Sequence, residues 1–423
     1  MSAETVADTG ATSTRPSAQR PFRWKRAGVL AKSSVIGPVD NILAAAVIAL
    51  LGFGLVMVYS ASAYEATVRF HNPQHYVTRQ AAYAVLALVT MWLTSRFDYR
   101  LVRFFTYPIL AGVIFLMVLT IVGFGHKAGN AYRWITLGPI HIQPSEMAKV
   151  ALVLWLAYSL SKKAEKVRAF WIGFVPHLVI LGLLMALCLK QPDFGSAFVL
   201  AMLTFALMFV AGVRVPHIIV SGVALAAAGV LLVKLSPYRM QRWMAFSDMD
   251  AHRSTLAYQP FQSVMSFGSG GVFGLGLGRG YQVLYLPESH TDFIAAIIGE
   301  ELGFVGVVGL CCVFGIVVWR GIKIALEAED DYGSYIAFGL SILLGAQVLL
   351  NLAVSMAIMP TKGLTLPFIS YGGSSLLVSA ASIGILLNIS RRRSTDGIPP
   401  AIEPKGPTQS ASAVVATAAE EGA

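Results

Sequence analysis

Long stretches without a charged residue constrain this chain more than any other feature. A helix needs about 20 apolar residues to cross a hydrocarbon layer of about 30 Å. Several stretches of that length contain no Asp, Glu, Lys or Arg: 41–64, 104–126, 169–189, 194–213, 215–233, 332–361 and 363–390. Only 13% of all residues are charged, against about 25% in soluble domains. The sequence therefore predicts a protein that crosses a membrane many times.

We predict an all-α, polytopic integral membrane protein with about ten transmembrane helices. One long extracytoplasmic loop, 235–291, separates helices seven and eight, and the membrane domain covers 39–390. The tails, 1–38 and 391–423, are rich in Ser, Thr and Ala, and we expect them to be disordered in the cytoplasm. The predicted spans are 41–62, 76–95, 103–124, 144–161, 170–189, 194–212, 215–234, 292–319, 333–358 and 367–389.

The basic residues give the orientation. Most of the 32 Lys and Arg residues fall in the tails and in every second loop, which predicts that both ends lie in the cytoplasm. The net charge of +10 does not indicate a nucleic-acid partner, because these residues sit in short blocks between apolar spans. The three cysteines, Cys188, Cys311 and Cys312, lie inside apolar spans without CxxC spacing, so neither a disulfide framework nor a metal site is expected.

The long loop has a composition of its own. It contains aromatic residues and a glycine-rich run from Gly268 to Gly280, which predicts a structured element on the outer membrane surface. The run lacks the GK[ST] ending of a nucleotide-binding loop, so nucleotide binding is not expected.

Ionisable residues gather at one side of the predicted membrane. Such a residue costs about 2.5–3.5 kcal/mol at mid-helix, so it needs a partner, water or a role. In the predicted topology these residues come from several loops and helix ends on the outer side: Arg133, Glu146, Lys149, Lys190, Asp193, His290, Asp292 and Lys362.

Several of these residues have a structural interpretation beside a functional one. Glu146 and Lys149 share a helix face, so they form a local ion pair or present the lysine to an anion. Asp193 fits a helix N-cap in a tight turn. Asp292 is a candidate general base, because desolvation raises the pKa of a carboxylate; alternatively Thr291 or Asp292 caps the next helix.

The last predicted span begins with Gly and Ser residues. Gly372 and Gly373 are typical of closely packed helices, and Lys362 lies just before this segment. From the residues alone, the basic groups outline an outward site for an anionic, lipid-linked substrate with one carboxylate nearby. A glycosyltransferase, a lipid transporter and an ion-coupled carrier all fit this pattern.

Five motifs in a consistent order resemble the SEDS family of shape, elongation, division and sporulation proteins, the RodA, FtsW and SpoVE group. The resemblance spans about residues 40–390 and is closest to the cell-division members. The motifs are Arg133-Trp134-Ile135, Gln143-Pro144-Ser145-Glu146 with Lys149, Gln191-Pro192-Asp193-Phe194-Gly195, Leu286-Pro287-Glu288 with His290-Thr291-Asp292-Phe293-Ile294, and Pro360 through Ser375. Ala357 departs from the pattern, because a glycine is expected there.

The resemblance implies a peptidoglycan glycosyltransferase that polymerises lipid II at the outer face of the cytoplasmic (inner) membrane, at the division septum. It implies Asp292 as the catalytic base. Substrate contacts are then expected from Arg133, Trp134, Glu146, Lys149, Gln191, Asp193, His290, Lys362 and Ser370.

The implied partners are a class B penicillin-binding protein (an FtsI-like transpeptidase), other divisome membrane proteins and membrane lipid. No cofactor is evident. A divalent cation is compatible with the reaction, but the sequence shows no ligand cluster. The alternatives are a lipid II flippase, an elongation polymerase of the RodA type and a non-catalytic scaffold. The charges cluster at one surface and no internal repeat is evident, which favours surface chemistry over transport.

Overall fold

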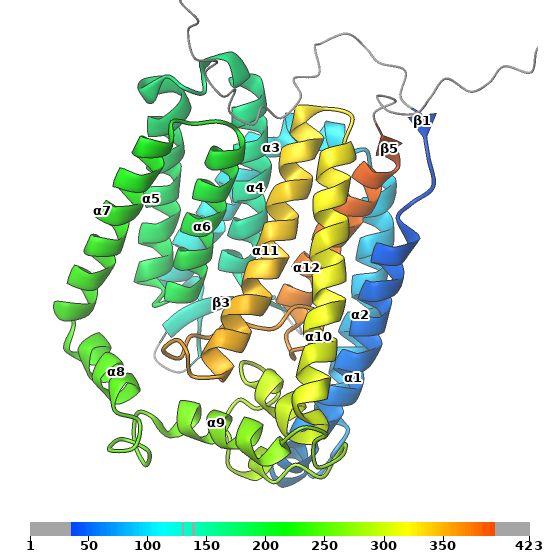
Figure 1. Ribbon diagram of the computed structural model, residues 1–423, viewed down its shortest axis with the longest axis vertical. Coiled ribbons are helices and arrows are strands. Elements are labelled where there is room, and N and C mark those ends of the chain that lie inside the picture. Colours follow the sequence, from blue (N-terminus) through cyan, green and yellow to red (C-terminus); the bar gives the residue numbers. More distant parts are fainter. Residues whose placement is uncertain (1–34, 129–130, 138–139, 394–423) are drawn as a thin grey trace, which may run out of the picture.

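The computed structural model describes residues 35–128, 131–137 and 140–393, and within them the chain is a bundle of α-helices (Figure 1). The helices are α1 (Asn41–Phe70), α2 (His75–Arg96), α3 (Tyr99–Leu119), α4 (Pro144–Lys162), α5 (Val175–Lys190), α6 (Phe194–Val210), α7 (Val215–Lys234), α8 (Pro237–Ser247), α9 (Tyr258–Gly270), α10 (Ile294–Glu327), α11 (Asp331–Ser355) and α12 (Gly373–Ser390).

All ten predicted spans are helices in the structure. Among the described residues, seven helices are long and apolar enough to cross a membrane by length and composition, and α6 is apolar but shorter, at 17 residues. The other two predicted spans are α2 and α4, whose polar residues lower their hydropathy. The chain is therefore a multi-pass membrane protein, as predicted.

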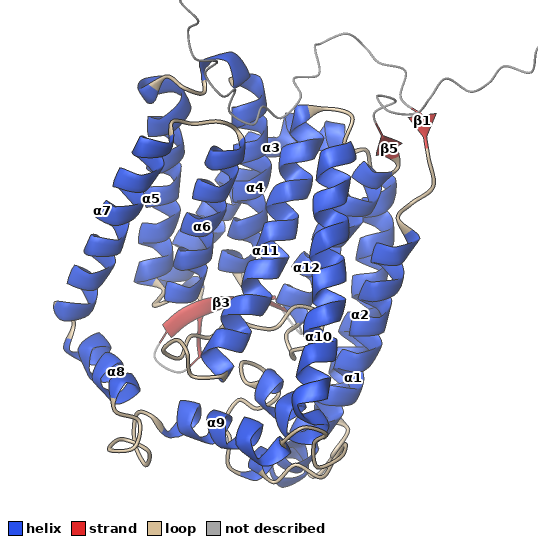
Figure 2. Ribbon diagram, in the orientation of Figure 1, coloured by secondary structure: helices blue, strands red, loops and turns tan. Residues whose placement is uncertain are grey.

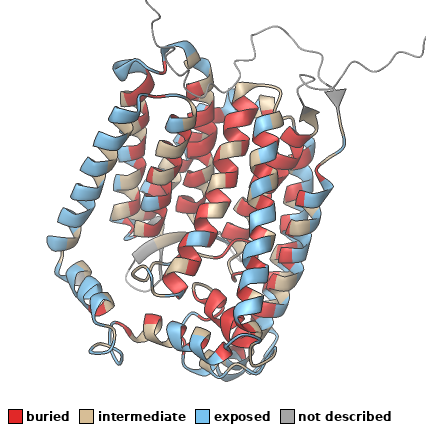
Figure 3. Ribbon diagram, viewed as in Figure 1, coloured by how far each residue is buried: buried red, intermediate tan, exposed pale blue. Residues whose placement is uncertain are grey.

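Burial separates the middle of the bundle from its rim (Figure 3). Helices α11 and α12 are mostly buried, whereas α7 has no buried residue in its apolar window. Apolar side chains on α7, such as Val220 and Val223, are more than 60% exposed. In a membrane protein such a surface faces lipid. The exposed apolar side chains of the rim are therefore in an apolar environment and not in water.

The described strands are short and lie at the two ends of the bundle (Figure 2). At one end, β1 (Val35–Ile36) pairs antiparallel with β5 (Arg392–Arg393), so the two described chain ends lie together. Between α3 and α4, β3 (Ala131–Leu137) pairs with β2 (His126–Ala128) and β4 (Ile140–Ile142). The predicted disordered tails fall mainly at 1–34 and 394–423, outside the described residues.

The long loop is structured, and it lies opposite β1 and β5 (Figure 1). It contains α8 and α9, and its glycine-rich part packs on the start of α10. Backbone N–H groups of Leu275 and Gly276 donate to the carbonyls of Glu300 and Glu301, at 3.0 and 2.9 Å. The side chain of Glu300 accepts from the N–H of Tyr281 at 2.8 Å. The backbone N–H groups of the glycine-rich segment thus donate hydrogen bonds to carbonyl and carboxylate oxygens at the start of α10.

Helix α10 departs from the predicted span 292–319. It begins at Ile294 and breaks at Gly303, whose φ of +66° is not helical. The prediction that Thr291 or Asp292 caps this helix is wrong, because Phe293 occupies the cap and no side chain bonds there. Asp292 therefore stands in the loop before the helix, where its carboxylate is free for other contacts.

The predicted start of the last span at 367 is also wrong, because α12 begins at Gly373. Phe368 has a φ of +66°, which turns the chain before the helix. Gly373 packs tightly: an added Cβ would lie 2.5 Å from the ring of Tyr83. Ala357 has a φ of +52°, a left-handed conformation that favours glycine, which explains why glycine is the expected residue there.

Candidate active site

The predicted site residues come from separate segments that meet beside the β2–β4 hairpin. Arg133 and Trp134 lie on β3, and Glu146 and Lys149 lie in the first two turns of α4. The remaining residues lie in the segments before three helices: Gln191 and Asp193 before α6, His290 and Asp292 before α10, and Lys362 and Ser370 before α12. These turns form because each motif contains a proline or a left-handed residue, such as Pro192 and Phe368. The fold therefore gathers most of the predicted site.

Asp292 and Arg133 flank the same point in space. A Cβ placed on Gly363 would lie 3.2 Å from Oδ2 of Asp292 and 3.8 Å from Nη1 of Arg133. Burial, with the nearby Glu288 carboxylate, raises the pKa of Asp292 to about 7, and the Arg133 guanidinium opposes that rise. A half-buried carboxylate with this pKa can exist in both protonation states near neutral pH, as a general base requires.

Asn351 on α11 ties the backbone of Asp292 to the segment before α12. Its Nδ2 donates to the carbonyl of Asp292 at 2.9 Å and to the carbonyl of Leu364 at 2.6 Å. Ser370 adds a second tie, because its Oγ donates to the carbonyl of Thr291 at 2.6 Å. Our sequence reasoning missed Asn351. The available signal was an amide side chain inside a long charge-free span, which Asn351 shares with Gln347.

Arg133 connects the hairpin to the turn before α6. Its Nε donates to the carbonyl of Gln191 at 3.0 Å, and its Nη2 donates to the carbonyl of Pro192. Both acceptors are carbonyls, and among the described residues no carboxylate forms an ion pair with Arg133, so its charge remains available to an anion. Trp134 is half-buried on the same strand.

Gln191 and Asp193 make structural contacts in this turn. Asp193 caps α6 as predicted, accepting from the N–H of Ser196 at 2.9 Å. Its second oxygen accepts from Oγ of Ser145 at 2.8 Å. The side-chain amide of Gln191 donates to the carbonyl of Met117 at 3.0 Å, while its buried Oε1 finds no hydrogen-bond partner in the part of the chain that the structure describes.

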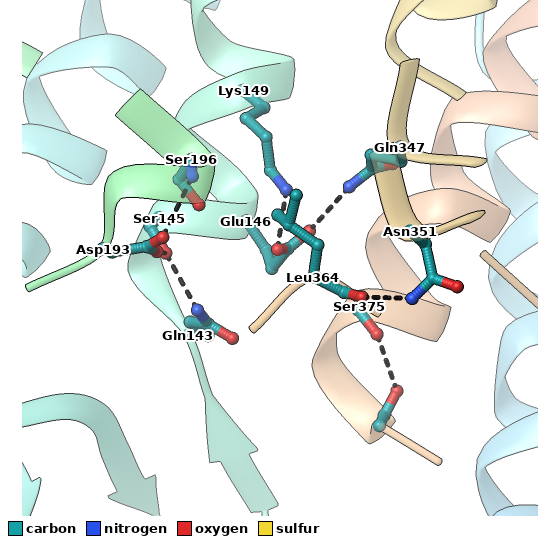
Figure 4. A network of polar contacts seen from close by, with 11 residues as sticks. Gln143, Ser145, Glu146, Lys149, Asp193, Ser196, Gln347, Asn351, Leu364 and Ser375 are labelled. Carbon is teal, nitrogen blue, oxygen red and sulfur yellow. Dashed lines mark hydrogen bonds and ion pairs between the residues drawn. The ribbon is translucent and has the colours of Figure 1, made fainter. Parts of the chain in front are cut away.

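Lys149 lies in a polar network inside the bundle (Figure 4). Its Nζ donates to Oε1 of Glu146 at 2.6 Å, which is the predicted ion pair. Gln347 on α11 donates to the other oxygen of Glu146 at 3.3 Å. The Lys149 side chain is fully enclosed, so it acts on the site through its charge and through the packing of α4 against α11.

His290 lies in an aromatic and acidic pocket. Its ring centroid is 4.5 Å from that of Tyr76 and 5.6 Å from that of Tyr371. Its Nδ1 is 3.5 Å from Oε2 of Glu65 on α1. Burial lowers the pKa of His290 although Glu65 opposes that effect. We did not single out Glu65 from the sequence, because it follows the first apolar span without a motif.

Lys362 is the most available cation of the set. Its Nζ lies 5.0 Å from the ring centroid of Phe198, and burial lowers its pKa. Within the described chain, no carboxylate pairs with it. Arg133 and Lys362 therefore supply two cations near Asp292 whose charge no carboxylate in the described residues cancels directly.

Comparison with known proteins identifies the family. The sequence model of the cell cycle protein family that includes FtsW, RodA and SpoVE matches residues 41–395. This chain belongs to the FtsW, RodA and SpoVE family.

Two types of relative support this membership. A protein of Trichlorobacter lovleyi named probable peptidoglycan glycosyltransferase FtsW is 44% identical over 364 residues, covering 86% of this chain and 96% of that protein. Among solved structures, a chain of a peptidoglycan synthase complex has a TM-score of 0.71 at 30% identity, covering 84% of this chain and 98% of that one. The rod shape determining protein RodA of Thermus thermophilus has a TM-score of 0.64 at 30% identity, with 84% and 97% covered. The FtsW, RodA and SpoVE fold thus extends over nearly the whole described chain.

A divalent cation at this site would need several carboxylate, histidine or cysteine ligands close together. In the described parts of the chain, no group of three or more His, Cys, Asp or Glu side chains is placed to hold a metal ion. Asp193, one of the carboxylates whose charge raises the pKa of Asp292, already accepts two hydrogen bonds. The described residues therefore do not provide a ligand set for the divalent cation considered from the sequence.

Proposed function

We propose that this chain is a peptidoglycan glycosyltransferase that polymerises lipid II into glycan strands during septal cell-wall synthesis. The observation that carries the proposal is the placement of Asp292, a carboxylate with a pKa raised to about 7, beside Arg133. The names of the relatives and the cell-cycle family model support the same activity.

The proposed reaction is a single displacement. Asp292 takes the proton from a hydroxyl of the acceptor sugar, and that oxygen attacks the anomeric carbon of the donor. The bond to undecaprenyl pyrophosphate breaks, and the leaving group takes the electron pair. One base without a second nucleophilic carboxylate suits inversion at the anomeric carbon.

The leaving pyrophosphate needs positive charge. Arg133 and Lys362 stabilise it. Arg133 lies beside Asp292, as does Gly363, the residue after Lys362, and no carboxylate in the described residues forms an ion pair with either side chain. Fixed cations at a position where negative charge develops lower the barrier without reorganisation. Asn351 and Ser370 hold the backbone that presents Asp292, so they act as positioning residues.

The substrate and partners follow from the same proposal. The enzyme works in the cytoplasmic (inner) membrane with both ends in the cytoplasm, so α8, α9 and the site face outward. The solved relative in a peptidoglycan synthase complex supports a class B penicillin-binding protein as partner, together with other divisome membrane proteins.

The test is polymerisation of lipid II by the purified chain with its penicillin-binding partner. Asp292→Asn is compared with Asp248→Asn, which makes the same change on the exposed end of α8. We expect glycan strands from the wild type and from Asp248→Asn, and a loss of at least about a hundredfold from Asp292→Asn, the range for a general base.

Two results would contradict the proposal. Equal polymer from Asp292→Asn and wild type would remove Asp292 from the mechanism. Absence of polymer from a folded wild-type complex, with transfer of lipid II across vesicle bilayers, would instead indicate the flippase.

A further inference from the structure

The strands β1 and β5 lie at the end of the bundle away from α8 and α9 (Figure 1), and residues next to β5 line a basic cavity. It has a volume of about 100 Å³ and is lined by Arg96, Asp98, Asn388, Arg391 and Arg392. Several water molecules would fit in such a volume, and so would a phosphate group. Three guanidinium groups against one carboxylate give the cavity an excess of positive charge.

The walls of this cavity are held in place by the chain itself. Asn388 on α12 accepts from the N–H of Tyr99 at 3.0 Å and donates to the carbonyl of Ser95 at 2.9 Å. These two bonds tie α12 to the corner between α2 and α3. The cavity is therefore preformed, which lowers the cost of binding a ligand.

The single carboxylate does not neutralise the cavity. One oxygen of Asp98 accepts from the N–H of Arg100 at 3.0 Å, and the other accepts from Arg392 at 2.8 Å. Arg96 lies over the ring of Trp92, 5.4 Å from its centroid. Across the described residues, neither Arg96 nor Arg391 forms an ion pair. Two guanidinium groups are thus left to attract an anion.

The surroundings of the cavity indicate where that anion comes from. Large apolar side chains beside it are strongly exposed, with Trp92 at 56%, Phe97 at 67% and Leu101 at 53%. They lie on α2, at the corner and on α3, which belong to the lipid-facing wall of the bundle. Tryptophan is enriched where acyl chains meet headgroups. A positively charged cavity beside exposed apolar side chains suits a molecule that carries both a charged headgroup and acyl chains.

We propose that this cavity binds the phosphate of an anionic phospholipid, with Arg96 and Arg391 as its main contacts. The acyl chains of that lipid lie along α2 and α3. Basic pockets at the ends of transmembrane helices on the cytoplasmic side suit anionic headgroups, and this end is cytoplasmic in the proposed orientation. A free anion would use the guanidinium groups but not the apolar wall.

The experiment titrates the purified full-length chain in a neutral detergent with phosphatidylglycerol, and native mass spectrometry counts the lipid retained. Each basic residue near an anionic headgroup contributes about 1 kcal/mol, so loss of two predicts an affinity at least about tenfold lower. Arg96→Gln with Arg391→Gln should show this loss. The matched control, Arg103→Gln with Lys166→Gln, removes two exposed charges from the same end and should bind as the wild type does.

Two further arms separate the sources of phosphate. Phosphatidylcholine and inorganic phosphate are titrated in the same way, with the midpoint of thermal unfolding as a second readout. We expect phosphatidylglycerol alone to raise the midpoint of the wild type and of Arg96→Lys with Arg391→Lys, which keeps both charges. If Arg96→Gln with Arg391→Gln retains phosphatidylglycerol normally, or if inorganic phosphate raises the midpoint equally, the lipid site is overturned.

Discussion

At the scale of single residues, Asp292 is surrounded by groups that act on its pKa in opposite directions. Burial and Glu288 favour the protonated form, whereas Arg133 favours the carboxylate. Because the base must be ionised to accept a proton, these neighbours decide at which pH the proposed reaction runs. The sequence placed the three residues in two motifs, but it did not show which effect dominates.

The first prediction concerns pH. A base with a pKa of about 7 is mostly protonated below that value, so kcat/KM should rise as the pH increases through about 7. Glu288→Gln removes a negative charge that raises this pKa, so the midpoint of the profile should move to lower pH. Initial rates of lipid II polymerisation between pH 5 and 9 measure both effects, with those limits set roughly two units either side of the pKa.

Glu165→Gln is the control for this profile, because Glu165 is exposed at the opposite end of the bundle. Its midpoint should equal that of the wild type. A profile that falls with increasing pH, or a midpoint that Glu288→Gln leaves in place, would contradict the role given to Asp292.

At the scale of elements, the glycine-rich segment and the start of α10 form one interlocked unit. A Cβ on Gly274 would lie 2.2 Å from the carbonyl oxygen of Glu301, and one on Gly303 would lie 2.3 Å from the N–H nitrogen of Gly274. Both glycines have positive φ, at +79° and +66°. This unit holds the first part of α10, before its break at Gly303, so the glycine run serves the site through packing.

The second prediction tests this interlock. Gly274→Ala combines a left-handed conformation with a backbone clash, and we expect it to destabilise the chain by about 2–4 kcal/mol. Gly268→Ala on α9 is the control, because an added Cβ meets no atom within 4 Å there and alanine favours a helix. Thermal unfolding in detergent compares the two variants. An unchanged midpoint for Gly274→Ala would show that the interlock does not stabilise the fold.

At the scale of the whole molecule, the arrangement assigns the two ends of the bundle to opposite sides of a membrane. The strands β1 and β5 lie at one end, and α8 and α9 lie at the other (Figure 1). The basic cavity is lined by residues at β5. Buried polar groups in the middle, such as Lys149 and Glu146, are paired with each other, which reduces the cost of placing charge within the bundle.

The third prediction concerns this orientation. In a variant with Cys188, Cys311 and Cys312 replaced by alanine, Asp250→Cys should react with a membrane-impermeant maleimide added outside intact cells. Glu165→Cys should react only after the membrane is opened. Both positions are exposed in the structure, so their difference reports the side of the membrane. The opposite result would reverse the proposed topology and place the site in the cytoplasm.

The amino-acid sequence by itself determined the class of the protein and most of its elements. The length of an apolar stretch is a local property, and a membrane accepts a polypeptide span almost only as a helix or a closed barrel, so the ten helices could be located without tertiary contacts. The Asp193 cap and the Glu146–Lys149 pair were also predictable, because their partners lie within three residues.

Only the tertiary structure decided how distant residues meet. Asn351 bonds the backbone at Asp292, 59 residues away. In the basic cavity, Arg96 at the end of α2 meets Arg391 and Arg392, which follow α12. The enclosure of Lys149, the starts of α10 and α12 and the approach of Arg133 to Asp292 also depend on packing. Such contacts arise from the way whole helices fit together, and no local pattern of residues specifies that fit.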